Sequence, residues 1–490
     1  MHITRFLSLS LLLSISLCST VFTKNNCSSK TIMTPRAIVE DSALANALTF
    51  YEKYKNYYAA DCQSAHSATI LNATPFYQRS TRGDKLASLF LPNNNSCFSV
   101  KEDGTGTVGS LWLNTIDPLN SSYASQISLS PQRQVLGALF QYNQDLSCIW
   151  RGLWVQAKLA VAQAKHSLHA KEKLSSELGT IDDAHTALEY LSSDAYKYGR
   201  LACGTVSKGG IDDMQFMLGT NIFHGDSAHI DIYLAALAPT SKKEDPTYLF
   251  APVIGRGGHA GVGAGFNAGW EIWSCNNHSI TLLTDFTYEY LFQAKENRSI
   301  DLKNGAWSRY LQVASSDNLT ATKPAINFLT QPVNVTPKSH INWWLAAHHD
   351  TGRFQTELGY NFWYKQQEQV CLNTCAKLPE TIGIADITGY ATNAGYFTSA
   401  SHATISQGVL APNQAVSDPV FVPLTLADLN LKSARQDREI TNKIYAACGY
   451  DISRCGKKSL LLGLGSSYEF ACKNNAIEQW GVWGNITFKF

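Results

Sequence analysis

The sequence has little of what marks a helical soluble enzyme or a nucleic-acid-binding protein. Only 4 of its 490 residues are methionine, 16% are charged, and the formal net charge is +1. Near-neutrality gives no case for a nucleic-acid partner. Cysteine and histidine nowhere show the spacing of a zinc site, so we expect no metal and no cofactor. Aromatic residues, in contrast, are plentiful, with 22 tyrosines and 11 tryptophans, which is typical of an all-β protein.

Long apolar runs are also missing, except at the N-terminus. Arg5 precedes an apolar run at residues 6–17, which is too short to cross a bilayer as a helix. A basic start and a run of this length are the parts of a secretory signal, so we expect residues 1–23 to be a signal peptide, cleaved between about residues 18 and 24. Because no later stretch approaches about 18 consecutive apolar residues, the sequence predicts no transmembrane helix.

Export through a signal peptide permits disulfide bonds. The chain has 12 cysteines, and loss of Cys18 with the signal leaves 11. The spacings between Cys371 and Cys375 and between Cys448 and Cys455 suit local disulfides. Free buried thiols fit these spacings equally well, so the sequence leaves both interpretations open.

Several long segments alternate strictly between apolar and polar residues. In residues 353–365, Phe354, Leu358 and Phe362 fall on one face, whereas Glu357 and Asn361 fall on the other. Successive side chains of a strand point to opposite faces, so each segment has one apolar and one polar face. Candidate strands lie near 68–80, 86–91, 105–114, 133–146, 149–166, 212–223, 227–238, 259–273, 278–293, 304–314, 338–349, 352–365, 380–397, 457–471 and 477–490.

The clearest of these strands are longer than those of soluble proteins, which average about 5–6 residues. A tilted membrane-spanning strand needs roughly 9–11 residues plus its extensions, and rings near the strand ends match the aromatic girdles of outer-membrane barrels. A soluble sandwich would have shorter strands and a less aromatic outer face. We therefore predict an all-β fold, a transmembrane antiparallel β-barrel of about 14 strands, within a range of 12 to 16.

The end of the chain carries a second barrel feature. Its last strand alternates and closes on Phe488 and Phe490, which resembles the assembly signal of bacterial outer-membrane β-barrels. Where that pattern has a glycine, this chain has Asn485, with Gly484 one residue earlier. The resemblance implies assembly by the barrel-assembly machinery and a place in the cell outer membrane.

Residues 209–273 resemble a recurrent unit of outer-membrane transporters for hydrophobic compounds, the fatty-acid and aromatic-hydrocarbon channels. Gly210 and Asp212 match the start of one strand, Pro239 and Thr240 match the end of the next, and Ser241 replaces the usual glycine. A glycine-rich strand follows. The resemblance implies a barrel channel that passes small, hydrophobic solutes.

We expect residues 24–67 to form either a plug of the lumen or a periplasmic extension, because their composition favours helix. Residues 68–490 should form the barrel. Two inserts, near 181–200 and 424–446, read as helices, and helices inside a barrel sequence usually cap loops or fill the lumen.

Enzymatic alternatives rest on weak motifs. Asp350-Thr351-Gly352 matches an aspartic protease, but the second such motif is missing and a turn between two strands is favoured. Ser227, in a Gly-Asp-Ser stretch, leaves an outer-membrane lipolytic enzyme as an alternative, although this stretch also favours a turn. His348 and His349 would face opposite sides of a strand and could not jointly bind a metal. We expect no catalytic residues and no enzyme activity.

The predicted function is passive transport of small solutes, with a surface adhesin or structural barrel as the competing interpretation. Partners would be the outer-membrane lipid, the assembly machinery and a small-molecule solute. Charges on the inward faces would line the pore, where water can hydrate them, or form cross-strand ion pairs. These residues are Lys158, Asp231, Glu271, Asp285, Glu289, Arg353, Glu357, Lys365 and Glu469.

Overall fold

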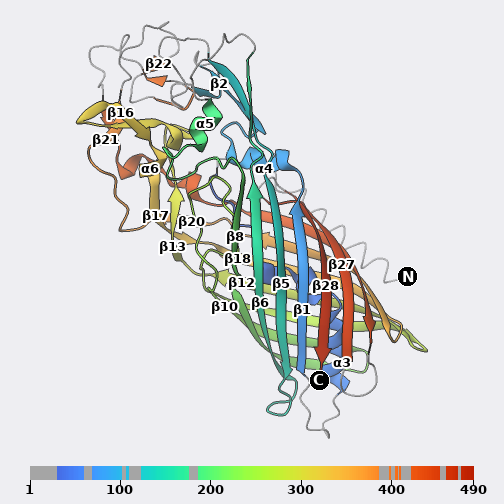
Figure 1. Cartoon of the computed structure of the whole chain (residues 1–490). Coiled ribbons are helices and arrows are strands. Elements are labelled where there is room, and N and C mark those ends of the chain that lie inside the picture. The colour runs from blue at the N-terminus through green and yellow to red at the C-terminus, as the bar shows by residue number, and fades with distance from the viewer. Residues whose placement is uncertain are drawn as a thin grey trace.

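The computed structural model describes residues 30–59, 69–101, 106–109, 123–175, 186–385, 397–398, 403–406, 408–409, 421–452, 459–472 and 476–490. Within these residues twelve long antiparallel strands close into one barrel, because β5 pairs with β1 on one side and with β6 on the other (Figure 1). The wall consists of β1 (Thr69–Ser80), β5 (Gln132–Asp145), β6 (Leu153–Ser167), β9 (Met214–His224), β10 (Ala228–Ala238), β11 (Gly261–Cys275), β12 (His278–Leu291), β18 (Lys338–Asp350), β19 (Phe354–Lys365), β26 (Glu439–Asp451), β27 (Ser459–Ala471) and β28 (Gln479–Lys489), in this order around the ring.

The barrel prediction is confirmed, whereas the expected count of about fourteen strands is not. Eleven of the twelve strands coincide with candidate segments, and the twelfth, β26, begins within the insert at 424–446 that was predicted as a helix and ends beyond it. The remainder of that insert holds only the short 3-10 turns η5 (Leu426–Asp428) and η6 (Leu431–Ala434). The helix prediction was wrong because two outward isoleucines of β26, Ile440 and Ile444, happen to be spaced like one face of a helix.

The wall is apolar outside and polar inside. Leu234, Leu358 and Leu464 face outward and are 68%, 67% and 69% exposed, whereas the inward residues Glu357 and Lys443 are buried. Water-soluble proteins have the opposite distribution. A continuous apolar outer face on a closed barrel is the arrangement that lipid requires, because lipid cannot solvate charge or unpaired backbone groups. The barrel is therefore built to span a membrane.

Inward glycines lie opposite inward aromatic rings on the neighbouring strand. Tyr233 pairs with Gly265, and Trp483 pairs with Gly465. A Cβ built on either glycine would fall 2.4 Å from atoms of the facing ring. The glycines thus make room for a ring that crosses to the next strand. This explains one glycine of the glycine-rich strand β11, Gly265.

The two ends of the barrel differ. At one end the connections are short, at residues 146–152, 225–227, 276–277, 351–353 and 452–458. At the other end, long connections build a compact region that we call the cap, visible at the top of Figure 1. The cap has its own apolar core, in which Trp307, Tyr310 and Phe98 are buried. The sequence did not predict the cap, because its strands are too short for the alternation of apolar and polar residues to be recognised.

The cap contains short strands and short helices. Candidate strands 86–91 and 304–314, and the described parts of candidate strands 105–114 and 380–397, lie here and not in the wall, and the first of them is helical. Its helices are α4 (Gly83–Phe90), α5 (Ala187–Ser192), which lies within the predicted insert at 181–200, η3 (Ser308–Tyr310) and α6 (Ile326–Leu329). Its strands are β2 (Cys97–Lys101), β3 (Val108–Gly109), β4 (Ala124–Ser128), β7 (Lys171–Leu174), β13 (Ala294–Ser299), β14 (Asp301–Leu302), β15 (Gln312–Ser315), β16 (Asn318–Pro324), β17 (Thr330–Thr336), β20 (Gln369–Leu372), β21 (Ile382–Ala385), β22 (Phe397–Thr398), β23 (Gly408–Val409), β24 (Phe421–Pro423) and β25 (Leu429–Asn430).

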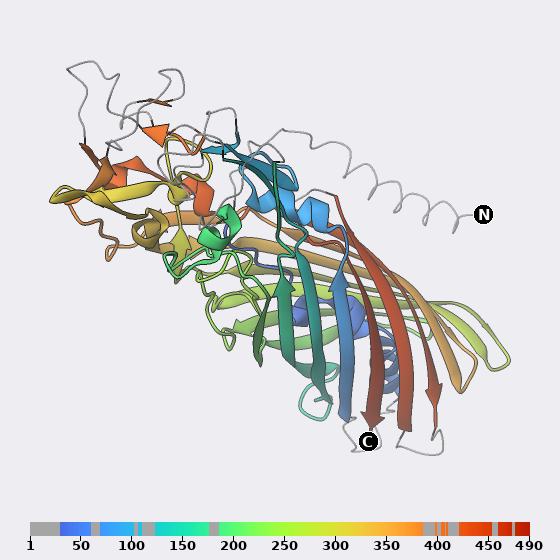
Figure 2. The ribbon, with the colours of Figure 1, turned by 45° about the horizontal axis from the view of Figure 1, so that its top comes forward.

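Residues 30–59, which we call the lumenal segment, run inside the barrel from the cap toward the short turns. They form η1 (Ile38–Glu40), α2 (Ser42–Asn46) and α3 (Thr49–Ala59), the dark blue helices inside the ring of strands in Figure 2. Near the cap, the amine of Lys30 lies 3.0 Å from the Asp437 carboxylate. At the far end, the Tyr51 hydroxyl donates to Asp350, 3.2 Å away. Among the described residues, no helix combines the length and hydropathy needed to cross a bilayer.

Candidate functional site

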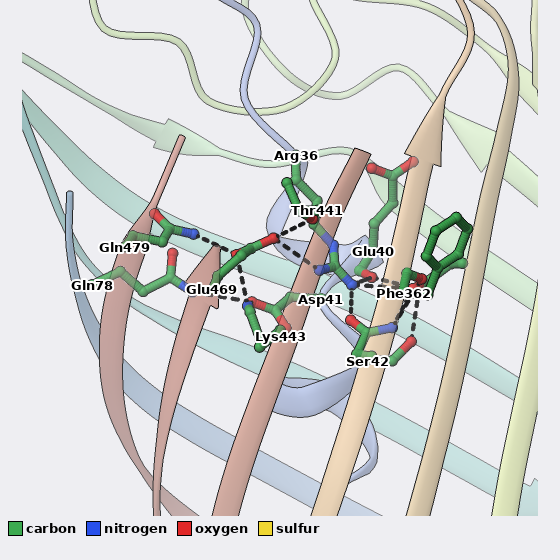
Figure 3. A network of polar contacts seen from close by, with 12 residues as sticks. Arg36, Glu40, Asp41, Ser42, Gln78, Phe362, Thr441, Lys443, Glu469 and Gln479 are labelled. Atoms are coloured by element: carbon green, nitrogen blue, oxygen red, sulfur yellow. Dashed lines mark hydrogen bonds and ion pairs between the residues drawn. The ribbon is translucent and has the colours of Figure 1, made fainter. Parts of the chain in front are cut away.

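The candidate site is the barrel lumen together with the segment that fills it. Three sets of polar contacts join the lumenal segment to the wall. In the first, Lys443 contacts Asp41 and also lies 3.1 Å from Glu469 (Figure 3). Glu469 in turn lies 3.3 Å from Arg36 of the lumenal segment. All these charges are buried, so each depends on its partners to offset the loss of hydration.

The second set of contacts centres on Arg256, which precedes β11. Its guanidinium lies 2.5 Å from Glu40 of the lumenal segment and 2.8 Å from Glu289 on β12. Glu40 also lies 2.8 Å from Nδ1 of His340 on β18. One carboxylate of the lumenal segment is thus held by groups from two separate parts of the wall.

The third set lies nearer the short turns. The Asn46 amide donates to Asp285 over 2.9 Å, and the Leu48 backbone N–H donates to Glu357 over 3.1 Å. Glu357 also accepts from Tyr445 over 2.5 Å and lies 2.9 Å from His348. Inward carboxylates of three strands therefore satisfy donors of the lumenal segment along its length.

The wall is interrupted at Asp212 and Asp213. Before them, β8 (Thr205–Ile211) pairs with the cap end of β6, and after them β9 pairs with the other end of β6. On its other side β9 pairs with β10, and this pairing ends at Met214. Among the described residues, β8 itself pairs with no strand other than β6. The ladder of hydrogen bonds around the barrel is therefore broken beside β8.

The two aspartates of the interruption hold neighbouring segments. The Asp212 carboxylate accepts the backbone N–H groups of Ile38 (2.6 Å) and Val39 (3.2 Å) in the lumenal segment. The Asp213 carboxylate accepts the N–H groups of Ser241 (3.2 Å) and Arg256 (2.8 Å). The lumenal segment is thus attached to the wall at the point where the wall is broken.

The residues at this interruption come from the motif that resembled transporters for hydrophobic compounds. The Thr240 hydroxyl donates to the Asp212 carbonyl over 2.6 Å. A Cβ built on Gly210 would meet nothing within 4 Å, so space lies beside β8. Sequence reasoning identified these residues as a motif but assigned them only the start and end of strands.

Of the nine predicted pore-lining residues, most face the lumen. Lys158, Asp231, Asp285, Glu289, Glu357, Lys365 and Glu469 are buried there, Glu271 is half-buried, and Arg353 is exposed in the turn after β18. Four of these residues contact the lumenal segment, namely Asp285, Glu357, Lys365 and Glu469. Glu289 instead contacts Arg256, and Asp231 contacts Asn221. Sequence reasoning missed the partners Arg36, Glu40, Asp41, Lys443 and Arg256, which no local pattern marks.

Cavities remain beside the lumenal segment, among them the following three. The lower cavity is lined by Lys53, Trp154 and Asp285, the middle one by Glu40, Lys158 and Gln215, and the upper one by Glu244, Arg298 and Glu368. Each has room for about one or two water molecules. None of these three cavities has room for a solute larger than water.

A cluster of charges lies at the cap end of the upper cavity, outside the spanning strands. His259 Nε2 lies 2.7 Å from Glu296, which in turn contacts Arg298 at 2.7 Å. Burial would raise the pKa of Glu296, but Arg298 and His259 lower it to about 2. Burial raises the pKa of the neighbouring Glu244 to about 7.

The remaining predicted sites have different outcomes. Of the two interpretations that the sequence left open, Cys371, Cys375 and Cys448 follow the free-thiol one, although they are exposed and not buried, and Cys455 lies outside the described residues. Cys448 points outward from β26. Cys472, which was not singled out, is disulfide-bonded.

The end of the last strand lies as its pattern predicts. Phe488 and Phe490 are exposed on the outer face at 49% and 52%. Asn485, in the place of the usual glycine, faces inward. Its amide lies 3.3 Å from the Thr74 hydroxyl and 3.4 Å from the Ala47 carbonyl of the lumenal segment. The departure from the pattern thus adds a contact between the last strand, the first strand and the lumenal segment.

The two enzyme-like motifs lie in turns at the short-turn end. Gly352 donates to the Asp350 side chain over 2.7 Å and has a positive φ of 91°, as a tight turn between β18 and β19 requires. Ser227 lies between β9 and β10, where Gly225 donates to the Ala228 carbonyl. His348 faces the lumen, whereas His349 faces outward.

No protein-family model matches the chain, and no curated protein matches it. Among solved structures it is similar to an outer-membrane channel from Pseudomonas putida F1, at 9% identity and a TM-score of 0.37, over 89% of this chain and 98% of that one. It is also similar to the Pseudomonas putida toluene transporter TodX, at 8% identity and a TM-score of 0.32, over 95% of each chain. The transport unit of the autotransporter AIDA-I from Escherichia coli matches at 7% identity and a TM-score of 0.28, over 91% of this chain and 98% of that one. The structures similar to this barrel thus include a hydrocarbon channel, although identities and TM-scores this low assign no function.

Proposed function

We propose that this chain is an outer-membrane channel for small, hydrophobic solutes and that the lumenal segment is its plug. The observation that carries the proposal is the interruption of the wall at Asp212, whose carboxylate holds the lumenal segment. A strand break is costly in lipid unless the freed groups are satisfied, so its position beside the filled lumen supports a role in passage.

In this proposal the plug must shift for a solute to pass, because the cavities beside it admit only water. Polar contacts hold most of its length, and these can exchange for contacts with water when the segment moves. A Cβ on Gly210 would meet nothing within 4 Å, and in this proposal the solute leaves the lumen toward the outer face through that open space. The transporter-like motif at residues 209–273 supports a hydrophobic solute.

The proposed orientation follows from the two ends of the barrel. Bacterial outer-membrane barrels have short periplasmic turns and longer extracellular loops, so the cap would lie outside the cell. The proposal includes export through a cleaved signal peptide, assembly by the barrel-assembly machinery and contact with outer-membrane lipid. It includes no enzymatic step, and hydrolysis of an ester that is lost in Ser227→Ala would contradict that part.

A second candidate function is binding of a cell or macromolecule at the surface. The cap supports it, because an apolar core with Trp307 and Tyr310 makes the long loops a folded unit. Loops that only bordered a channel would not need such a core. Loss of surface binding after removal of the cap, with solute uptake unchanged, would favour this alternative.

A reversible cross-link tests whether the plug must move. A Cβ on Gly463 would lie 2.6 Å from the Leu48 Cδ1, so Leu48→Cys combined with Gly463→Cys should lock the plug to β27. We expect Gram-negative cells that make the double variant to take up a radiolabelled aromatic solute more slowly when oxidised, and normally after a reductant is added. Each single variant serves as a control. Equal uptake by cells with and without the protein would exclude transport of that solute.

A further inference from the structure

The three cavities beside the lumenal segment form a series along one side of the lumen. The lower and middle cavities share Met217 in their linings, and the middle and upper cavities share Glu40 and His340. The lower cavity reaches His229, two residues from the turn at Ser227, and the upper one reaches Pro337, just before β18. The series therefore covers most of the height of the barrel.

Polar atoms without partners point to water in these cavities. Within the described residues, Glu40 Oε2, Gln215 Oε1, His340 Nε2 and Arg256 Nη1 are buried and have no hydrogen-bond partner. Each belongs to a side chain that lines the middle or the upper cavity. Buried polar groups are almost always hydrogen-bonded, and a polar cavity of this size holds about one or two water molecules. Ordered water is therefore their natural partner.

The two junctions between the cavities differ in chemistry. Between the middle and upper cavities, His340 and Glu40 lie 2.8 Å apart, and each keeps one atom available to water. Between the lower and middle cavities lies Met217, which packs with Trp154, Tyr233 and Ala235 in a small apolar cluster. Water can hydrogen-bond across the first junction, whereas the thioether of Met217 interrupts the series. Methionine is flexible, so this junction can open transiently.

We propose that these cavities hold a single file of water that carries protons through the barrel while the lumenal segment stays in place. The file is too narrow for a hydrated metal ion or an organic solute, because each cavity holds about one or two waters. Met217, the apolar side chain that the lower and middle cavities share, sets the rate in this proposal. This path is independent of the solute route of the proposed function.

Proton flux into proteoliposomes tests the path, with a pH-sensitive dye inside the vesicles and valinomycin with potassium to balance charge. We expect vesicles with the protein to lose a pH gradient faster than protein-free vesicles. Met217→Trp should slow this flux about threefold or more by filling the junction, and Met217→Ala should leave it equal or faster. Sodium flux should stay at the level of protein-free vesicles in all three.

Leu218 provides the matched control, because it is the next residue on β9 and faces outward at 52% exposure. Leu218→Trp should leave the proton flux unchanged, and heat-modifiable gel migration shows whether each variant is folded. Wild-type flux equal to that of protein-free vesicles would overturn the proposal. So would a flux that neither Met217 variant changes.

The cross-linked double variant tests the water file and the proposed solute transport separately, because only solute transport requires the plug to move. Vesicles with oxidised Leu48→Cys, Gly463→Cys protein should keep their proton flux, because the cross-link holds the segment in place without closing the cavities. Cells with the same protein should lose solute uptake. Loss of proton flux on cross-linking would show that protons need plug movement and would contradict the water file, whatever the solute result.

Discussion

Leu48 of the lumenal segment lies against Gly463 of β27 so closely that a Cβ on Gly463 would fall 2.6 Å from the Leu48 Cδ1. Gly449 on the neighbouring β26 faces the same leucine, with a Cβ distance of 3.0 Å. Two glycines on adjacent strands thus receive one apolar side chain of the lumenal segment. This contact fixes how near the segment can come to the wall.

Gly463→Val should push the lumenal segment away from β27. The added branches overlap Leu48, and overpacking of this kind costs about 1–3 kcal/mol. We expect the barrel to assemble and residues 30–59 to become more sensitive to protease, as measured by limited proteolysis in detergent. Gly484→Val is the control, because a Cβ there meets its nearest neighbour at 3.7 Å. Equal sensitivity of the two variants would contradict the contact.

Lys443→Met should loosen the same segment through electrostatics. The change leaves Asp41 and Glu469 buried without the amine that both contact, and loss of one partner from a buried ion pair costs about 3–5 kcal/mol. The melting temperature measured by circular dichroism should fall. Arg82→Ala breaks an exposed pair with Asp84 and should leave the melting temperature nearly unchanged. A small effect at Lys443 would mean that the segment does not depend on this pair.

The sequence predicted the wall well because alternation is a local property. A strand with one face in lipid and one in a polar lumen repeats every two residues, so the face of Leu358 or Glu357 follows from its position. Strand β26 was not predicted as a strand, because its outward-facing side chains are not all apolar: Asn442 lies between Ile440 and Ile444. Its period was therefore ambiguous.

The contacts within the lumen could not be predicted in this way. Asp41 and Lys443 meet although 402 positions separate them in the chain, and Glu40 meets His340 across 300. Such pairs depend on how the barrel closes and how the segment threads it, and neither leaves a local pattern. The inward charges were identified, but their partners in the lumenal segment were not.

Substitutions at two adjacent residues of β19 should have opposite effects on assembly. Leu358→Arg places a charge on the lipid face, which costs about 2–4 kcal/mol near the middle of the membrane. We expect less folded protein, as judged by heat-modifiable gel migration. Glu357→Gln should assemble. However, its amide retains only one oxygen for the Leu48, Tyr445 and His348 contacts. The free energy that holds the lumenal segment against the wall should therefore fall by about 1–3 kcal/mol.

The charge cluster between the cap and the upper cavity should make stability depend on pH in two windows. In the folded protein the pKa of Glu296 is lowered to about 2. Glu296 therefore adds to the free energy of unfolding at any pH above the ordinary pKa range of a carboxyl group, and this stabilisation is lost as the pH falls toward about 2. Burial raises the folded pKa of Glu244 to about 7, so its contribution is present below the ordinary range and is lost as pH rises through about 7. Burial would lower the pKa of His259, but its hydrogen bond to Glu296 raises it. The stability that His259 contributes is therefore also greatest at acidic pH and is lost as the pH rises.

These signs predict maximal stability at mildly acidic pH. Glu244→Gln removes the group that titrates near neutrality and keeps an oxygen for the Thr34 hydroxyl, which donates over 2.7 Å. In this variant the melting temperature should fall less than in the wild type between about pH 5 and pH 8, because the buried amide carries no charge at either pH. Glu189→Gln is the control, since Glu189 is exposed in α5, outside this cluster. If the wild type and Glu244→Gln lose stability equally over this range, Glu244 does not hold its proton in the folded protein.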